Sequence, residues 1–131
     1  MSLERKTVLL HIANERLRDA NVLLKQKRYN GAVYLGGYVI ECMLKAAICV
    51  YLSRNDLPAI YQIHDLDELM DSSGLLPSLQ IDRKMSSHFL TIEGWCVGIR
   101  YLGKRFKASE AKHFLDAVKE IRQWILTKIS P

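Results

Sequence analysis

A long and almost uninterrupted apolar run, from Gly31 to Leu52, constrains the fold of this chain more than any other feature. The run is long enough to cross a bilayer, but Glu41 and Lys45 stand near its middle. Each charge would cost roughly 2.5–3.5 kcal/mol at the centre of a membrane. A helix that is apolar nearly all round is otherwise the central helix of a globular core. We therefore predict a helix that begins near Asn30, as its N-cap, ends near Ser53 and lies inside a soluble protein.

Apolar residues at alternating spacings of three and four predict two further long helices, one at each end of the chain. The first is expected from Leu3 to Lys27, on the stripe Leu10, Ala13, Leu17, Ala20 and Leu24. The last is expected from Ser109 to Ile129, on the stripe Ala111, Phe114, Val118, Ile121 and Ile125. The short link 26–30 predicts that the first two helices form an antiparallel hairpin.

The middle of the chain predicts shorter elements. A short helix is expected from Asp65 to Asp71, ended by Ser72–Gly74, and then an apolar connector over 75–81. Asp82 is a good N-cap for a further helix that continues through Ile92 toward Tyr101, with a kink at Gly94 or Gly98. No segment alternates with period two, so we predict no sheet. Gly36 and Gly37 predict a close helix–helix approach, because each costs about 1 kcal/mol in a helix interior without one.

Length and composition favour one all-α domain over residues 1–131, since 49% of the residues are hydrophobic and can form a real core. The three cysteines, Cys42, Cys49 and Cys96, have apolar surroundings and no CxxC spacing, so we interpret them as small core residues. The chain opens without a signal-peptide pattern, and the expected location is the reducing cytoplasm.

The net charge of +5 is unevenly distributed. The segment from Asn55 to Asp82 contains acidic residues and no Lys or Arg, whereas 100–112 is strongly basic. Phosphate-binding glycine loops of the GxGxxG and GxxxxGK[ST] types are missing. His11, His64, His88 and His113 lack metal-ligand spacing, so we expect no metal and no cofactor.

Three local patterns have both a structural and a functional interpretation. Glu41 and Lys45, four residues apart, favour an ion pair whose lysine reaches toward solvent; alternatively, Glu41 orients a basic group such as Arg100 across the bundle. The stretch 100–107 suits phosphate and base contacts, or is a solvated loop. His64 caps the short helix or fills space, or acts in catalysis.

These motifs together resemble the HEPN superfamily. The resemblance lies in residues 28–47, with Glu41-x-x-x-Lys45-Ala46, in His64–Asp65–Leu66–x–x–Leu69, and in Arg100–Tyr101. It implies a four- or five-helix up-and-down antiparallel bundle, often a homodimer, with a binding or RNA-directed role. Many members are encoded beside minimal nucleotidyltransferases, and some such pairs are toxin–antitoxin systems.

Many HEPN proteins are also metal-independent ribonucleases that carry Arg, four to six residues, and then His. Arg100 and Arg105 have no histidine at those spacings, whereas Arg83–His88 and Arg5–His11 fit. Such pairs are expected by chance in a chain with this many arginines, and Lys84 follows Arg83 where the stronger forms of the motif have a polar residue.

The sequence thus leaves three hypotheses of function. The preferred one is a non-catalytic module that binds a nucleotide, RNA or a nucleotidyltransferase partner, through Arg100, Tyr101, Lys104, Arg105 and Lys107, with Glu41 and Lys45 lining the groove. The second is a ribonuclease in which His88 transfers protons and Arg83 stabilises the phosphorane-like charge. The third is a structural interaction domain whose acidic segment, 56–71, meets a basic partner surface.

Overall fold

The computed structural model describes residues 5–97, 99 and 103–130, and over these residues the chain is all-α. Its elements are α1 (Lys6–Lys25), α2 (Tyr29–Tyr51), the 3-10 turn η1 (Ala59–Tyr61), α3 (Leu66–Ser72), α4 (Leu76–Ile81), α5 (Arg83–Val97) and α6 (Ala108–Ile129). The predicted fold class is confirmed. Within the described ranges, the only extended pairing is an isolated bridge between Arg5 and Asp56.

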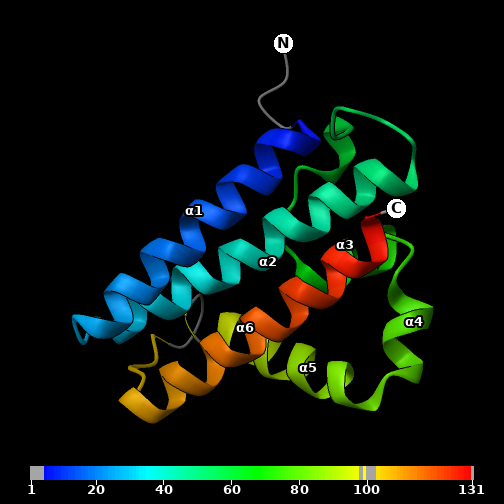
Figure 1. Cartoon of the computed structure of the whole chain (residues 1–131). Coiled ribbons are helices and arrows are strands. Elements are labelled where there is room, and N and C mark those ends of the chain that lie inside the picture. Colours follow the sequence, from blue (N-terminus) through cyan, green and yellow to red (C-terminus); the bar gives the residue numbers. More distant parts are fainter. Residues whose placement is uncertain (1–4, 98, 100–102, 131) are drawn as a thin grey trace.

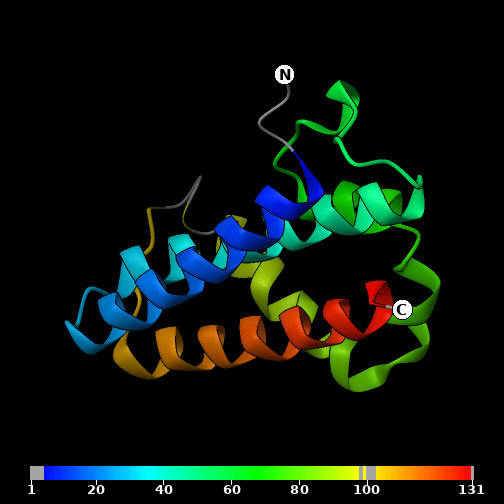
Figure 2. The same ribbon diagram turned by 45° about the horizontal axis from the view of Figure 1, so that its top comes forward.

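Helix α2 lies at the centre of the bundle and contacts α1, α3, α5 and α6. The four long helices α1, α2, α5 and α6 run alternately up and down (Figure 1), and α6 packs on α2 and also contacts α1 (Figure 2). The short helix α3 packs on α2, and α4 packs on α5. The antiparallel hairpin of α1 and α2 and the up-and-down bundle are therefore as expected.

The length and mean hydropathy of α2, 1.6 over its most apolar window, would allow it to cross a membrane. However, 78% of that window is buried inside the protein. The other helices cover it because it is apolar on nearly every side, as a core helix must be. The structure thus places this segment in the core of a helical bundle.

Gly36 and Gly37 allow the close approach that the sequence predicted. A Cβ atom on Gly36 would lie 2.8 Å from side-chain atoms of Phe114 and Leu115 on α6. A Cβ atom on Gly37 would lie 2.6 Å from the sulfur of Cys96 on α5. Both distances are shorter than carbon packing permits, so two other helices approach α2 at these glycines.

Several predicted boundaries were wrong. Helix α1 begins at Lys6, where the backbone N–H donates to the carbonyl of Asn55. Helix α2 begins at Tyr29 after Arg28, so Asn30 is not its N-cap. Residues 76–81 form α4 rather than a connector, since Pro77 lies in the first turn, where a proline removes no helical hydrogen bond.

Two helix starts were predicted well. Asp65 caps α3 by accepting from the N–H of Glu68 at 3.1 Å, and Asp82 caps α5 by accepting from the N–H of Met85 at 3.0 Å. Gly98 and Tyr101, where the sequence suggested a kink and the end of α5, lie outside the described residues.

Candidate functional site

The predicted site residues that the structure describes lie mainly in two places along α2. The first is a groove of about 530 Å³ at the start of α2, which we call the basic groove. Its lining includes Lys27, Arg28, Tyr29, Asn30, Arg105 and Phe106. The cations come from two segments far apart in the sequence, the α1–α2 turn and the loop before α6.

The α1–α2 turn presents Lys27 and Arg28 through a defined backbone motif. The N–H of Arg28 donates to the carbonyl of Leu23 at 2.9 Å, and the N–H of Lys27 donates to that of Leu24 at 3.1 Å. This Schellman pattern requires a left-handed residue after the helix, normally glycine. Lys27 occupies that position with φ 61°, which is a strained conformation for a residue with a side chain. Neither cation was predicted from the sequence as a site residue, although their place in a short basic link was a usable signal.

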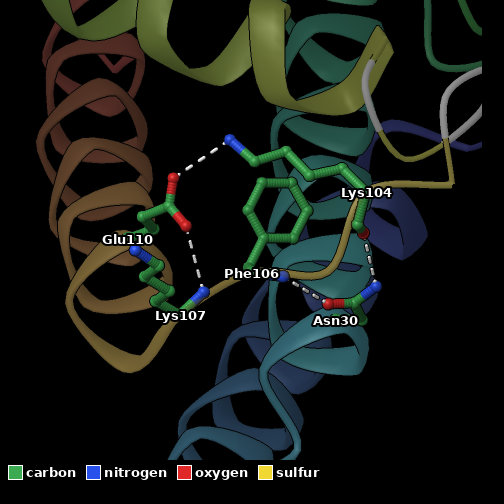
Figure 3. A network of polar contacts seen from close by, with 5 residues as sticks. All are labelled: Asn30, Lys104, Phe106, Lys107 and Glu110. Carbon is green, nitrogen blue, oxygen red and sulfur yellow. Dashed lines mark hydrogen bonds and ion pairs between the residues drawn. The ribbon is translucent and has the colours of Figure 1, made fainter.

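Asn30 fixes the second segment onto the start of α2 (Figure 3). Its Nδ2 donates to the carbonyl of Lys104 at 2.8 Å, and its Oδ1 accepts from the N–H of Phe106 at 2.9 Å. The ring of Phe106 is buried, and its centre lies 5.5 Å from the centre of the nearest Trp95 ring. Arg105 lies between these two anchored residues and is exposed, so its backbone is held while its side chain faces the basic groove.

The neighbouring lysines are arranged differently. The ammonium of Lys104 lies 3.0 Å from Glu110 Oε2 and 5.3 Å from the centre of the Phe106 ring. Glu110 Oε1 also accepts from the backbone N–H of Lys107 at 3.1 Å. The hydrogen bond from the Lys107 N–H lowers the pKa of Glu110 most, and the contact with Lys104 lowers it further. Glu110 thus partly neutralises Lys104. Arg100 and Tyr101 lie outside the described residues.

The second place is a pocket of about 430 Å³ further along α2, which we call the tyrosine pocket. Tyr34, Gly37, Tyr38 and Glu41 line it from α2. His64 and Leu66 line it from the start of α3, and Cys96 and Ile99 from the end of α5 and just beyond. Cys42 and Cys49 are core residues as predicted, whereas Cys96 is only partly buried at this pocket.

Glu41 lies at the bottom of this pocket and contacts two basic groups. Its Oε2 is 3.2 Å from Lys45 Nζ and 2.9 Å from His64 Nδ1. The side chains of Glu41 and Lys45 are 5% and 6% exposed, whereas that of His64 is 70% exposed. The expected ion pair therefore forms, but its lysine is buried instead of reaching solvent. Glu41 also contacts the ring of His64, whereas the predicted contact with Arg100 falls on a residue outside the described ranges.

Three acidic residues are close in sequence to residues that line the tyrosine pocket, without lining it themselves. Asp65 and Asp67 flank the pocket residue Leu66, and Glu93 lies one turn before Cys96 on α5. Burial, then a hydrogen bond and charge repulsion from Asp67, and then the charge of Asp65 raise the pKa of Glu93 to about 7. Glu93 thus lies close to two other carboxylates, those of Asp67 and Asp65.

Arg83 and His88 lie in neither place, since both belong to the first half of α5. Residues five apart on a helix point about 140° away from each other. Arg83 is exposed, and the Nε2 atom of half-buried His88 is buried without a hydrogen-bond partner among the described residues. The other pair with this spacing, Arg5 and His11, is a weaker candidate for catalysis. His11 is exposed, and Arg5 lies 3.5 Å from Asp56.

The fold and its two sites define a class of protein: a small helical bundle whose apolar central helix carries a buried Glu–Lys pair beside an exposed histidine. A family model for the HEPN domain matches residues 7–129, and the chain belongs to this family. Membership connects it with ribonuclease or nucleotide-related functions in general. No curated protein and no solved structure matches the chain significantly.

Proposed function

We propose that this protein binds RNA or a nucleotide through its phosphates, in the basic groove. The observation that carries the proposal is the convergence of Lys27, Arg28 and Arg105 on one groove from two distant segments. Lysine and arginine side chains bind phosphate by charge and by charge-assisted hydrogen bonds. Membership of the HEPN family supports the same class of ligand.

The local structure favours a binding surface over a solvated loop. Asn30 holds the loop by two hydrogen bonds, so Arg105 is presented from a fixed backbone. Lys27 occupies a left-handed position that glycine would adopt without strain. A fixed backbone and a cation kept at a strained position are expected where the side chains contact a ligand.

The test measures binding of a fluorescein-labelled eight-nucleotide RNA by anisotropy at several salt concentrations. We expect Arg28→Ala/Arg105→Ala to weaken binding at least ten-fold. The slope of log K against log salt should fall by about 0.7 for each phosphate that the variant no longer neutralises. Lys104→Ala/Lys119→Ala removes the same charge outside the basic groove and should have a much smaller effect. Unchanged binding by the first variant, or equal effects of both, would reject this site.

A second candidate is a ribonuclease with Arg83 and His88, favoured by the Nε2 of His88, which is buried and has no hydrogen-bond partner within the part of the chain that the structure describes. Since one helix does not bring the two side chains together, the active site would combine residues from two subunits. The test incubates the protein with RNA in EDTA. Cleavage that His88→Ala abolishes would support this candidate, whereas no cleavage, or cleavage unchanged by His88→Ala, would reject it.

The proposal extends to assembly and location. We propose a cytoplasmic homodimer that works with a minimal nucleotidyltransferase, as in a toxin–antitoxin pair. The support is family membership alone. Light scattering of the purified protein tests the dimer. Co-expression with the neighbouring reading frame tests the partner, and failure of the two proteins to co-purify would oppose it.

A further inference from the structure

We infer that the basic groove binds a terminal phosphate, the phosphomonoester of a free nucleotide or of the end of an RNA strand, rather than the phosphodiesters within a strand. This inference rests on the proposed function and specifies its substrate class. It is carried by three uncompensated cations that share one groove with the unpaired backbone donors at the start of α2.

The cations of the basic groove have no counter-charge in the structure. Lys27, Arg28 and Arg105 are all exposed, and none of them forms an ion pair with a described residue. Among the described residues, no carboxylate lines the groove. The undescribed segment beside Gly103, residues 100–102, contains no Asp or Glu either. Three positive charges therefore converge on one groove of about 530 Å³, which favours an anion there.

The backbone adds donors at the same place. Tyr29, Asn30 and Gly31 are the first residues of α2, and all of them line the groove. The first N–H group within α2 that donates to a carbonyl is that of Ala32, to Arg28 at 3.0 Å. The N–H groups of the residues before it in the helix have no acceptor among the described residues, as is usual for a first helical turn. They are free to donate to a ligand in the groove.

No side chain competes for these donors. The N-cap is Arg28, which makes no side-chain cap, and the first turn of α2, which is fully described, contains no acidic residue. The amide of Asn30 is already bonded to Lys104 and Phe106 in the loop. Unpaired N–H groups and the helix dipole both favour negative charge, so an anion held by the cations would also receive these hydrogen bonds.

A terminal phosphate matches this arrangement better than an internal one. A phosphomonoester carries a charge of about −1.5 to −2 at pH 7 and presents three unesterified oxygens. A phosphodiester carries a single charge and presents two such oxygens. Three cations and a helix start at one place therefore suit the more highly charged group. Leu23 and Tyr29 also line the groove, whose volume is in the range of small-molecule sites and leaves room for the attached nucleoside.

Calorimetry on the full chain tests the inference with five ligands. These are AMP, adenosine, and an eight-nucleotide RNA with a 5′-phosphate, with a 3′-phosphate or with hydroxyls at both ends. We expect one of the phosphorylated octamers to bind at least ten-fold more tightly than the hydroxyl octamer, and AMP to bind more tightly than adenosine. Equal affinities of AMP and that octamer would identify a free nucleotide as the source of the phosphate, and a tighter octamer would identify a strand end.

The variants locate the effect. Arg28→Ala/Arg105→Ala should remove the advantage of the phosphorylated octamer. Lys104→Ala/Lys119→Ala, which removes the same charge outside the basic groove, should retain it. The advantage should also grow between pH 5 and pH 7.5, because the second pKa of a phosphomonoester is about 6. The described charged groups that face this phosphate are Lys27, Arg28 and Arg105, and the hydroxyl octamer corrects for titration elsewhere in the protein.

The outcomes separate this inference from the proposed function. If all three octamers bind equally and the arginine variant weakens them alike, the groove binds internal phosphates, so the inference fails and the proposed function stands. An advantage that the arginine variant keeps, or that does not change with pH, would also overturn the inference. If the arginine variant binds every ligand as the parent protein does, the proposed function itself fails.

Discussion

His64 Nδ1 lies 2.9 Å from Glu41 Oε2, so that an almost fully buried carboxylate holds a largely exposed imidazole ring. The two residues are 23 positions apart, Glu41 in α2 and His64 in the loop before α3. The same oxygen is 3.2 Å from Lys45 Nζ, which brings its compensating charge into the core. One buried carboxylate thus connects the interior of the bundle with the mouth of the tyrosine pocket.

Breaking the buried contacts of Glu41 should strongly destabilise the protein. Glu41→Leu leaves Lys45 buried without its charge partner, and we expect the free energy of unfolding to fall by about 3–5 kcal/mol. Lys45→Met should cost less, because Glu41 keeps its contact with His64. Urea denaturation followed by circular dichroism measures both changes.

The double variant Glu41→Leu/Lys45→Met is the control for this prediction. It removes both charges together, so it should be more stable than either single variant. A double variant destabilised by the sum of the two single effects would show that the pair is not coupled. His64→Ala should cost much less, because its ring is mostly exposed.

Gly36 and Gly37 of α2 should not tolerate a methyl group. Gly36→Ala places a Cβ atom 2.8 Å from Phe114 and Leu115, and we expect the unfolding free energy to fall by about 1–3 kcal/mol. Gly94→Ala is the matched control, since a Cβ there meets nothing within 4 Å. It should stabilise the protein by about 1 kcal/mol through helix propensity alone. Thermal unfolding of the two variants should therefore shift in opposite directions.

The sequence predicted the long helices because each has a clear apolar pattern that packing then satisfies. The stripes of α1 and α6 and the continuous run of α2 determine which faces are buried. Boundaries were less predictable. Asn30 resembled a helix cap, but its side chain bonds to a loop 76 residues away, and only the tertiary structure shows this. Helix α4 was missed because the apolar segment 75–81 was predicted to be a connector, although its Pro77 lies in the first turn, where a helix tolerates proline.

Only the part of the candidate site that depends on local sequence patterns was predictable. Charge density identified the segment that contains Arg105, and spacing identified the pair of Glu41 and Lys45. Neither pattern indicates which residues from distant parts of the chain lie beside Arg105 or Glu41. Lys27 and Arg28 reach the basic groove only because Asn30 brings the loop to them, and His64 reaches Glu41 only through the path of the chain before α3.

Glu93 should make stability depend on pH. Its pKa is raised from 4.5 to about 7, first by burial and then by Asp67, so the folded state holds this proton more tightly than the unfolded state. Between pH 4.5 and 7 the unfolded chain loses the proton while the folded chain keeps it, and the stability contributed by this group therefore falls as pH rises. The effect is modest because the carboxyl is only partly buried.

Glu93→Gln should remove this dependence. We expect the variant to match the parent protein near pH 4 and to be more stable at pH 8, in urea titrations at both values. Glu110→Gln is a control of opposite sign, since contacts with Lys107 and Lys104 lower the pKa of Glu110. Glu110 contributes its stability above its ordinary pKa and loses it as pH falls. A Glu93→Gln difference that does not change with pH would contradict the raised pKa.

Lys27→Gly should stabilise the fold and weaken binding at the same time. Glycine adopts the left-handed conformation at φ 61° without steric strain, so we expect the unfolding free energy to rise by about 0.5–1 kcal/mol. Removal of the cation should reduce affinity for the eight-nucleotide RNA and lower the salt slope by about 0.7.

Ser53→Gly provides the matched control, because Ser53 has φ 55° in the same turn motif at the other end of α2. It should stabilise the protein by a similar amount and leave RNA binding unchanged. If both variants gain stability and both bind normally, Lys27 does not contact phosphate, whereas a Lys27→Gly protein no more stable than its parent would show that the turn carries no strain.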